Sequence, residues 1–474
     1  MRKNKEIKAG AGYTIGNILI KGISFISLPI FSRILSTQDY GLYNTYVAYE
    51  ALITIIIGLG MHAAIKNSQF DYRNRVQTFI STQIIIVSMV VFLLLILCAV
   101  FRAPIERITG FGFVIIFFLI LQSFGSAILN ILNAKLALKY NYKNYLYYAG
   151  FNTVTNVLLS ILLIFTVCNN NRLLGRVLGT ALPMIIIGIR VVFKEIPKKT
   201  LKFDKGMALY ALKFGFPLIW HYLSQQVASQ FDRIMIANMV SVSATGIYCF
   251  VYAIANIFQI LFYSTDNVWS VWFFKQMKDQ NYGYIKKRSF HYILLMAGLV
   301  CIMMVVSREV IMIMGGKAYW EGVDLFIPIV IGVYFLFLYT IPVGIEYYYK
   351  ETKYIAASTF LSAFVNVLLN YIFIMMYGYT AAAYTTAVSY LVMFASHWII
   401  SSRILKKHGI DQFLNLGNFI IVSIGVCLFG TACLFLNSHT FIKYTIFIIG
   451  ITINCCIFKR ELKIFFHKMI DNKK

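Results

Sequence analysis

Charged residues are scarce in this sequence. Only 13% of its 474 residues are Asp, Glu, Lys or Arg, about half the share that soluble domains carry. The mean hydropathy is correspondingly high, at +0.74. Most of the surface must therefore face something other than water. With about 20 apolar residues for each span plus a short connection, the length predicts an all-α integral membrane protein with about fourteen transmembrane helices.

Several kinds of chemistry lack the residues that they require. No Gly-rich phosphate loop occurs, which argues against a nucleotide-driven pump. The connections on one side of the membrane are short and hold no cluster of His, Asp and Glu, so we expect a transporter rather than a membrane enzyme. The eight cysteines fall in or beside apolar stretches without zinc-site spacing. We therefore expect no metal, no catalytic residue and no organic cofactor.

Fourteen apolar windows are separated by polar or charged connections. Backbone groups in hydrocarbon must be satisfied within their own segment, so each window predicts a helix. The expected spans are 9–33, 41–65, 77–101, 111–133, 145–168, 174–193, 209–231, 244–265, 290–313, 325–348, 354–376, 380–402, 416–437 and 441–458.

Lysine and arginine are distributed unequally between the two sides that these spans define. If the N-terminus is cytoplasmic, 32 of the 43 basic residues lie on the cytoplasmic side, 9 lie on the other side and two lie within helices. This asymmetry predicts cytoplasmic N- and C-termini. The net charge of +25 is then mainly a topology signal, with added attraction to anionic lipid. Because the basic residues are dispersed over short loops, we expect no nucleic-acid partner.

Three short strings recur in the same order along the chain. They are Phe31-Ser32-Arg33-Ile34 and Phe231-Asp232-Arg233-Ile234, Gly41-Leu42-Tyr43 and Gly246-Ile247-Tyr248, and Asn156-Val157-Leu158-Leu159 and Asn366-Val367-Leu368-Leu369. Their offsets are 200, 205 and 210 residues, as small loop insertions would produce. The repeat predicts two pseudo-symmetric six-helix bundles, 1–200 and 201–408, followed by two helices and a basic tail in 409–474. Two such bundles around a cleft are typical of an alternating-access transporter.

These segments also resemble a known family. The end of the first helix and the connection after it, Ser36-Thr37-Gln38-Asp39-Tyr40-Gly41-Leu42-Tyr43, resemble the opening of the polysaccharide (Wzx-type) flippases of the MATE-like multidrug/oligosaccharidyl-lipid/polysaccharide (MOP) superfamily. The segments that begin at Tyr349, Asn366 and Tyr377 resemble the same family. The lipid II flippases are more distant, because their arginine-aspartate pair is not matched by Ser32-Arg33.

The resemblance implies a flippase of the bacterial cytoplasmic (inner) membrane. Its substrate would be an undecaprenyl-pyrophosphate-linked oligosaccharide, which polymerase and chain-length proteins then assemble into capsule, O-antigen or exopolysaccharide. Two alternatives remain open, namely a MATE-like drug or cation antiporter and a lipid II-type flippase.

Two ionisable residues occupy matching places in the two repeats. Lys21 lies near the middle of the first span, with Asn17 and Ser24 on the same helical face. The offset of 200 places His221 and Ser224 in the equivalent positions of span seven. A cationic cleft of this kind would pair with a pyrophosphate. Alternatively, Lys21 extends toward the membrane surface and His221 is an interhelical structural residue.

Two further groups of residues are candidates. Arg33 and Arg233 lie near the outer ends of their helices, where they would receive the head group or, alternatively, cap the helix C-termini. Glu50, Asp266 and Glu346 lie in or near spans and would bind a coupling H⁺ or Na⁺, or else form salt bridges within a bundle. An antiporter for cationic drugs would need a cavity lined by carboxylates, whereas Lys21 and His221 favour an anionic cargo.

Overall fold

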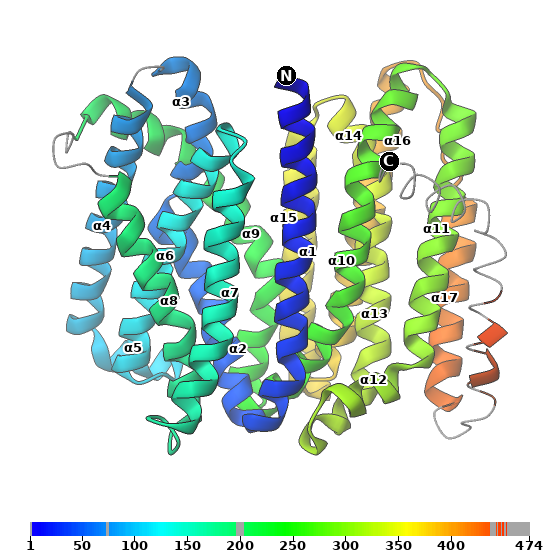
Figure 1. Ribbon diagram of the computed structural model, residues 1–474. Helices are drawn as coiled ribbons and strands as arrows, with labels where there is room; N and C mark the ends of the chain where they lie inside the picture. The colour runs from blue at the N-terminus through cyan, green and yellow to red at the C-terminus, as the bar shows by residue number, and fades with distance from the viewer. Residues whose placement is uncertain are drawn as a thin grey trace, which may run out of the picture. The chain divides into compact units, whose positions relative to one another are not determined.

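The computed structural model describes residues 2–72, 75–195, 203–436 and seven positions between 442 and 452. These residues form helices and connections without a strand, so the predicted all-α fold is confirmed for the described part of the chain. Figure 1 shows the long helices running side by side within each half of the chain.

The helices follow one another with short connections. In the first half they are α1 (Arg2–Ile34), α2 (Thr37–Gly58), η1 (Met61–Ala64), α3 (Ile65–Asp71), α4 (Val76–Val100), α5 (Arg102–Thr109), α6 (Phe113–Leu138), α7 (Tyr142–Phe165), α8 (Arg172–Glu195) and α9 (Lys205–Met239). The second half holds α10 (Val242–Lys278), α11 (Tyr282–Val305), α12 (Ser307–Met314), η3 (Lys317–Gly322), α13 (Val323–Leu338), α14 (Thr340–Tyr348), α15 (Thr352–Tyr377), α16 (Ala381–Lys407) and α17 (Leu416–Leu436).

The helices agree with the expected membrane spans. Each of the first thirteen spans coincides with a long helix or with a pair of consecutive helices. Among the described residues, ten helices are long and apolar enough to cross a bilayer. The bent pair Thr37–Gly58 and Met61–Gln69 adds an eleventh if it is counted as one span. The expected span 441–458 lies largely outside the described residues. The chain is therefore a multi-pass membrane protein.

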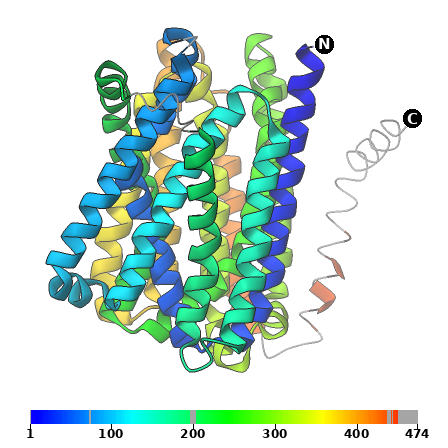
Figure 2. The same ribbon diagram turned by 60° about the vertical axis from the view of Figure 1, so that its left-hand side comes forward.

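The chain forms two compact units, residues 1–246 and 247–474, whose boundary lies inside α10. In the first unit, α2, α4, α6, α8 and α9 surround an apolar core that includes Tyr46, Phe79 and Ile128. Helix α1 packs on α7, as Figures 1 and 2 show. The expected division into two six-helix bundles at residue 200 stays a prediction.

The second unit is built around α13. The segment Lys317–Tyr348 contains α13 and α14, and 89% of the residues in its 18-residue apolar window are buried. In α13, apolar residues lie on every side of the helix, as expected of a helix that is enclosed by neighbouring helices. Helix α16 packs along α13, and α15 packs along α16.

One hydrogen bond occurs at equivalent positions in both units. In the first unit, Arg176 Nη1 donates to Asn156 Oδ1 at 2.5 Å and joins α8 to α7. In the second unit, Asn366 Nδ2 donates to Thr386 Oγ1 at 3.2 Å and joins α15 to α16. Both residues of the second pair lie 210 positions after those of the first. The internal repeat found in the sequence therefore corresponds to a repeated helix–helix contact.

A second repeat-related feature lies within the first unit, where α2 crosses the beginning of α10. A Cβ atom on Gly41 would overlap the carbonyl oxygen of Val242, and one on Gly246 would overlap that of Thr37. Gly41 and Gly246 are 205 residues apart, and so are Thr37 and Val242. The two contacts are therefore reciprocal, and they explain why the repeated string carries glycine in both copies.

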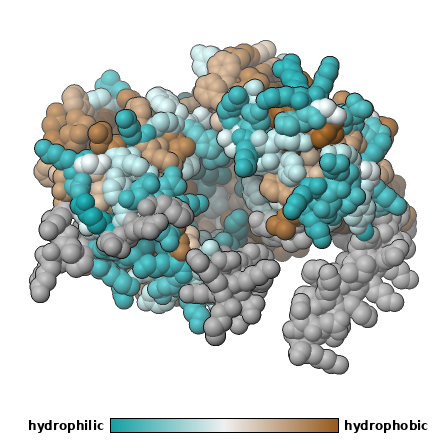
Figure 3. All heavy atoms as spheres, turned by 90° about the horizontal axis from the view of Figure 1, so that it is seen from above, coloured by the Kyte–Doolittle hydropathy of each residue, from teal (hydrophilic) through white to brown (hydrophobic). Residues whose placement is uncertain are grey.

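Basic connections gather at one end of the first unit. The beginning of α1, helix α3 and the α6–α7 connection lie at this end in Figures 1 and 2. Figure 3, which is seen from this end, shows many hydrophilic side chains on it. That this end faces the cytoplasm remains a prediction from the charge asymmetry.

Candidate functional site

Helix α2 breaks before it reaches the end of its span. It stops at Gly58, and the chain continues as η1 and α3 with a bend of 52°. Leu59 and Gly60 adopt φ angles of 48° and 64°, in the left-handed region. A residue with a Cβ in this conformation costs about 1–2 kcal/mol. Because such backbone strain clusters at functional sites, the break is a candidate region for ligand binding.

Helix α9 lies against this break. The backbones at Gly60 and Gly215 approach so closely that a Cβ on either glycine would meet the other segment. Pro217 follows two residues later, inside α9. Proline cannot donate the hydrogen bond that would continue the helical pattern. The break after α2 therefore adjoins a helix with an internal proline, and broken helices are found at transporter binding sites.

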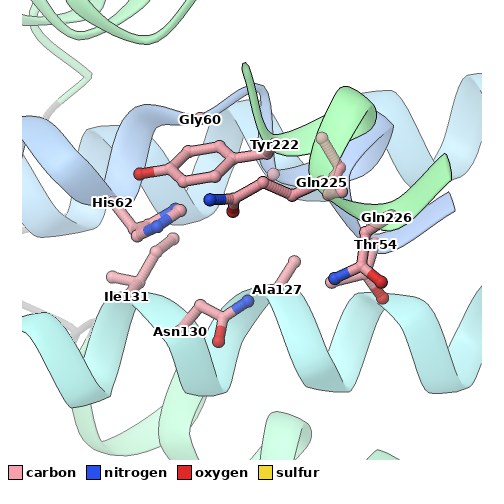
Figure 4. Close-up of a pocket in the computed structure, with 11 residues that line it drawn as sticks. Thr54, Gly60, His62, Ala127, Asn130, Ile131, Tyr222, Gln225 and Gln226 are labelled. Carbon is pink, nitrogen blue, oxygen red and sulfur yellow. The ribbon is translucent and has the colours of Figure 1, made fainter. Parts of the chain in front are cut away.

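A pocket of about 180 Å³ opens at this place. Figure 4 shows side chains from α2, η1, α6 and α9 surrounding it. Its lining consists of Thr54, Ile55, Gly58, Gly60, His62, Ala127, Asn130, Ile131, Tyr222, Gln225 and Gln226. The pocket lies wholly within the first unit.

The polar groups of the pocket are mostly neutral hydrogen-bonding groups. The rings of His62 and Tyr222 stack with their centroids 5.3 Å apart. Asn130 on α6 and Gln225 on α9 lie on opposite sides of the pocket (Figure 4). Each amide offers both donors and an acceptor. None of the lining residues is Asp, Glu, Lys or Arg. Such a lining suits a group rich in hydroxyls better than a cation.

Glu50 lies one helical turn before the pocket residue Thr54. Its Oε1 accepts hydrogen bonds from Thr54 Oγ1 at 3.0 Å and Ser126 Oγ at 2.7 Å. A salt bridge within the bundle was the alternative role, and this carboxylate forms none within the described residues. Glu50 is thus a carboxyl held by hydroxyl groups beside the pocket, and its role in ion coupling stays a prediction.

The side chains predicted around Lys21 lie on helix α1. Lys21 and Ser24 are exposed, and the Ser24 hydroxyl donates to the Ile20 carbonyl oxygen at 3.2 Å. Asn17 Oδ1 accepts a hydrogen bond from Tyr145 Oη on α7 at 2.9 Å. The structure therefore explains Asn17 through helix packing. It leaves Lys21 as a cation on the surface of the first unit.

Of the equivalent residues on α9, His221 adjoins a residue of the pocket. The ring of His221 is 5.7 Å from that of Tyr222, which lines the pocket. The Ser224 hydroxyl donates to the Trp220 carbonyl oxygen at 2.7 Å. Both α1 and α9 belong to the first unit. The joint action of Lys21 and His221 on an anion stays a prediction.

The two repeat-related arginines have local backbone contacts. Arg33 Nη1 donates to the Pro29 carbonyl oxygen at 2.8 Å, in the last turn of α1. This bond matches the helix-capping alternative. On α9, the backbone N–H of Arg233 donates to Asp232 Oδ1 at 2.8 Å. A role of either guanidinium at the exit side stays a prediction.

In the second unit, Glu346 on α14 pairs with His397 on α16. His397 Nδ1 lies 2.7 Å from Glu346 Oε1, and both side chains are fully buried. Tyr339 stacks on the imidazole with a centroid distance of 5.3 Å. The remaining polar atoms, Glu346 Oε2 and His397 Nε2, are buried and have no hydrogen-bond partner among the described residues. Asp266, the third carboxylate candidate, is half-buried on α10.

Sequence reasoning missed several of these residues. His397 is an ionisable residue inside an expected span, which by itself marks a candidate. Arg176 is one of the nine basic residues predicted on the non-cytoplasmic side, but it lies buried in α8. The pocket residues carried no local signal, because they come from four separate elements.

Comparison with known proteins gives consistent results. The model of the family described as "Polysaccharide biosynthesis protein" matches residues 7–273. A Haemophilus influenzae protein of the Lsg locus is 24% identical over 374 residues, which cover 77% of this chain and 90% of that protein.

Two solved structures share the fold. A structure of the lipid II flippase MurJ, in an inward closed conformation, matches with a TM-score of 0.70 at 15% identity. The match covers 95% of this chain and 99% of the MurJ chain. An inward-facing MATE multidrug transporter of the MOP superfamily matches with a TM-score of 0.65 at 13% identity. The match covers 83% of this chain and 99% of the transporter. The resemblance to the MOP superfamily is thus confirmed at the level of the fold.

Proposed function

Because the chain belongs to the polysaccharide biosynthesis protein family, we propose that it is a flippase for undecaprenyl-pyrophosphate-linked oligosaccharides. It moves these units across the bacterial cytoplasmic membrane by alternating access, with both of its termini in the cytoplasm. The shared fold of a lipid II flippase and a MATE transporter supports a transporter rather than an enzyme. Polymerase and chain-length proteins then act on the exported units.

The pocket at the break in α2 is the observation that carries this proposal. It combines stacked rings with amide and hydroxyl groups inside a membrane-spanning unit. Sugar hydroxyls bind such donors and acceptors, and aromatic faces stack on sugar rings. A cation antiporter would instead need carboxylates, and the pocket lining has none. The pocket therefore binds sugars of the head group, while the polyprenyl chain stays in lipid.

The anionic pyrophosphate requires cations in addition to this pocket. In our proposal, Lys21 and His221 bind it, with Asn17, Ser24 and Ser224 on the same faces, and Arg33 and Arg233 receive it at the outer side. Charge-assisted hydrogen bonds replace the water that the phosphates lose. A proton or a sodium ion on Glu50, Asp266 or Glu346 drives the cycle.

Deletion of the gene tests the function directly. We expect undecaprenyl-linked oligosaccharide to accumulate and the surface polysaccharide to disappear, because the units remain in the inner leaflet. Both pools are measured in the same cells by lipid extraction and surface staining. The sugars recovered from the lipid then identify the substrate. Unchanged lipid pools together with a changed sensitivity to cationic drugs would contradict the proposal and favour an antiporter.

Complementation of the deletion strain tests the predicted cations. The double variant Lys21→Ala/His221→Ala should lower export at least about tenfold, since each charge-assisted hydrogen bond contributes about 1.5–3 kcal/mol. Surface polysaccharide is measured at matched amounts of protein in the membrane. Lys213→Ala is the control, because Lys213 is an exposed lysine on the same helix as His221. Normal export by the double variant would remove both residues from the mechanism.

A further inference from the structure

Arg176 is a buried cation in the second turn of α8. Its side chain is 8% exposed. Its guanidinium lies between the rings of Phe31 and Tyr43, with its carbon 3.9 and 4.2 Å from their centroids. Each cation–π contact contributes about 0.5–2 kcal/mol. Four helices therefore meet at this side chain, because Phe31 lies on α1, Tyr43 on α2 and Asn156 on α7.

The hydrogen bonds of Arg176 leave its charge uncompensated. Nη1 donates to Asn156 Oδ1 at 2.5 Å, to Ser160 Oγ at 2.7 Å and to Thr180 Oγ1 at 3.3 Å. All three acceptors are neutral, and no carboxylate pairs with Arg176 in the described part of the chain. A buried charge without a counter-ion is costly, particularly inside a membrane. Nε and Nη2 make no hydrogen bond within the described residues.

The second unit shows that helix pairing does not require this charge. At the position equivalent to Arg176 it carries Thr386, whose hydroxyl oxygen accepts a hydrogen bond from Asn366, whereas Arg176 donates one to Asn156. A threonine is therefore sufficient to join the two helices of a repeat. The charge of Arg176 is therefore not needed to join α7 and α8.

We propose that Arg176 is an anion-binding residue that receives the pyrophosphate of the lipid-linked substrate at the outer end of the first unit. This inference rests on the proposed function. The free Nε and Nη2 donors form the planar fork that binds two phosphate oxygens at once. Arg172 lies one turn earlier on α8 and donates to the Ile34 carbonyl oxygen at 2.7 Å, so a second guanidinium lies at the same end. The bound pyrophosphate supplies the counter-ion that the protein lacks.

Binding of a short isoprenoid pyrophosphate to the purified full-length protein tests this assignment. Farnesyl pyrophosphate, farnesol and inorganic pyrophosphate are titrated separately by calorimetry in detergent micelles. We expect Arg176→Thr, which copies the second repeat, to bind farnesyl pyrophosphate at least about tenfold more weakly. Binding of farnesol should not change. A higher affinity for farnesyl pyrophosphate than for inorganic pyrophosphate identifies the lipid head group as the ligand, and the reverse order identifies the free anion.

Two further variants separate binding from structure. Arg107→Thr removes an equal charge from an exposed position on α5 and should leave binding unchanged. Arg176→Lys keeps the charge without the fork and should bind with intermediate affinity. If Arg176→Thr fails to fold, Arg176→Lys decides the question. Should that variant melt like the wild type and bind farnesyl pyrophosphate as tightly as the wild type does, the assignment is wrong.

The remaining outcomes distinguish this inference from the function on which it rests. Equal affinity of the wild type and Arg176→Thr for farnesyl pyrophosphate overturns the role of Arg176 and leaves the flippase proposal intact. An equal loss in Arg107→Thr also overturns it, because the effect would then be a general one of charge. A wild-type protein that binds none of the pyrophosphates counts against the proposed function as well.

Discussion

Replacing His397 by alanine should lower the free energy of unfolding by about 3–5 kcal/mol. His397 and Glu346 are both fully buried and lie 2.7 Å apart. Removal of the imidazole leaves the carboxyl group without its partner in an apolar interior, where an unpaired polar or charged group is costly. Glu346→Ala should have a similar cost, because it leaves the imidazole unpaired. Thermal or denaturant unfolding in detergent micelles measures both effects.

A double variant shows whether the loss of stability comes from the unpaired polar group. Glu346→Leu/His397→Leu removes both polar groups and should recover most of the lost stability, since apolar residues of similar volume often replace a buried ion pair at little cost. His291→Ala is the control, because the imidazole of His291 bonds the Lys287 carbonyl oxygen near the surface. If the double variant is as unstable as the two single variants combined, packing rather than the pairing of charge explains the loss.

A conservative change at the same pair tests ion coupling. Glu346→Gln keeps the shape and the hydrogen-bonding capacity of the side chain but cannot titrate. If Glu346 carries the coupled proton, flipping by this variant in proteoliposomes should no longer respond to an imposed pH gradient. Glu50→Gln and Asp266→Asn test the other two candidates in the same assay. An unchanged response in all three variants would exclude these carboxyls as the coupling sites.

Removing the amides from the pocket should lower export at least about tenfold. The sugar hydroxyls would lose their hydrogen-bond partners, and each unsatisfied group costs about 1–3 kcal/mol of binding free energy. The variant Asn130→Leu/Gln225→Leu removes a donor and an acceptor from opposite walls (Figure 4). Leucine has nearly the shape of asparagine and is similar in size to glutamine. Surface polysaccharide in the complemented deletion strain measures export.

The fold should tolerate this variant, because both amides are exposed to the pocket or the surface. Its melting temperature should therefore stay near that of the wild type. Asn144→Leu changes an exposed asparagine outside the pocket and serves as the matched control. Normal export by the pocket variant would show that this cavity does not bind the sugars.

The structure also explains the limits of the sequence-based prediction of the helices. Hydrocarbon requires every backbone group to bond within its own helix, so the apolar windows alone determined where the helices lie. The same windows did not reveal the break at Leu59 and Gly60, because its neighbours in sequence are apolar and the span appears continuous. Gly215 of α9 closely approaches the break, and it lies more than 150 residues away in the sequence.

For the candidate residues, too, the sequence predicted some features and not others. Lys21, Glu50 and Glu346 were found because an ionisable residue in an apolar window is conspicuous by itself. The environment of each was not predictable. Glu50 bonds Ser126, which is 76 residues away, and Glu346 bonds His397, which is 51 residues away.

By itself, the sequence determined the membrane class, the order of the helices, the internal repeat and the family resemblance, because each of these depends on local composition or on matches along the chain. Only the tertiary structure decided which polar groups meet. Arg176 was one basic residue among 43 in the sequence. In the folded chain it is a buried cation between two aromatic rings, at a position where the second repeat has threonine. Burial and pairing are properties of the packed helices, so no pattern within a single helix specifies them.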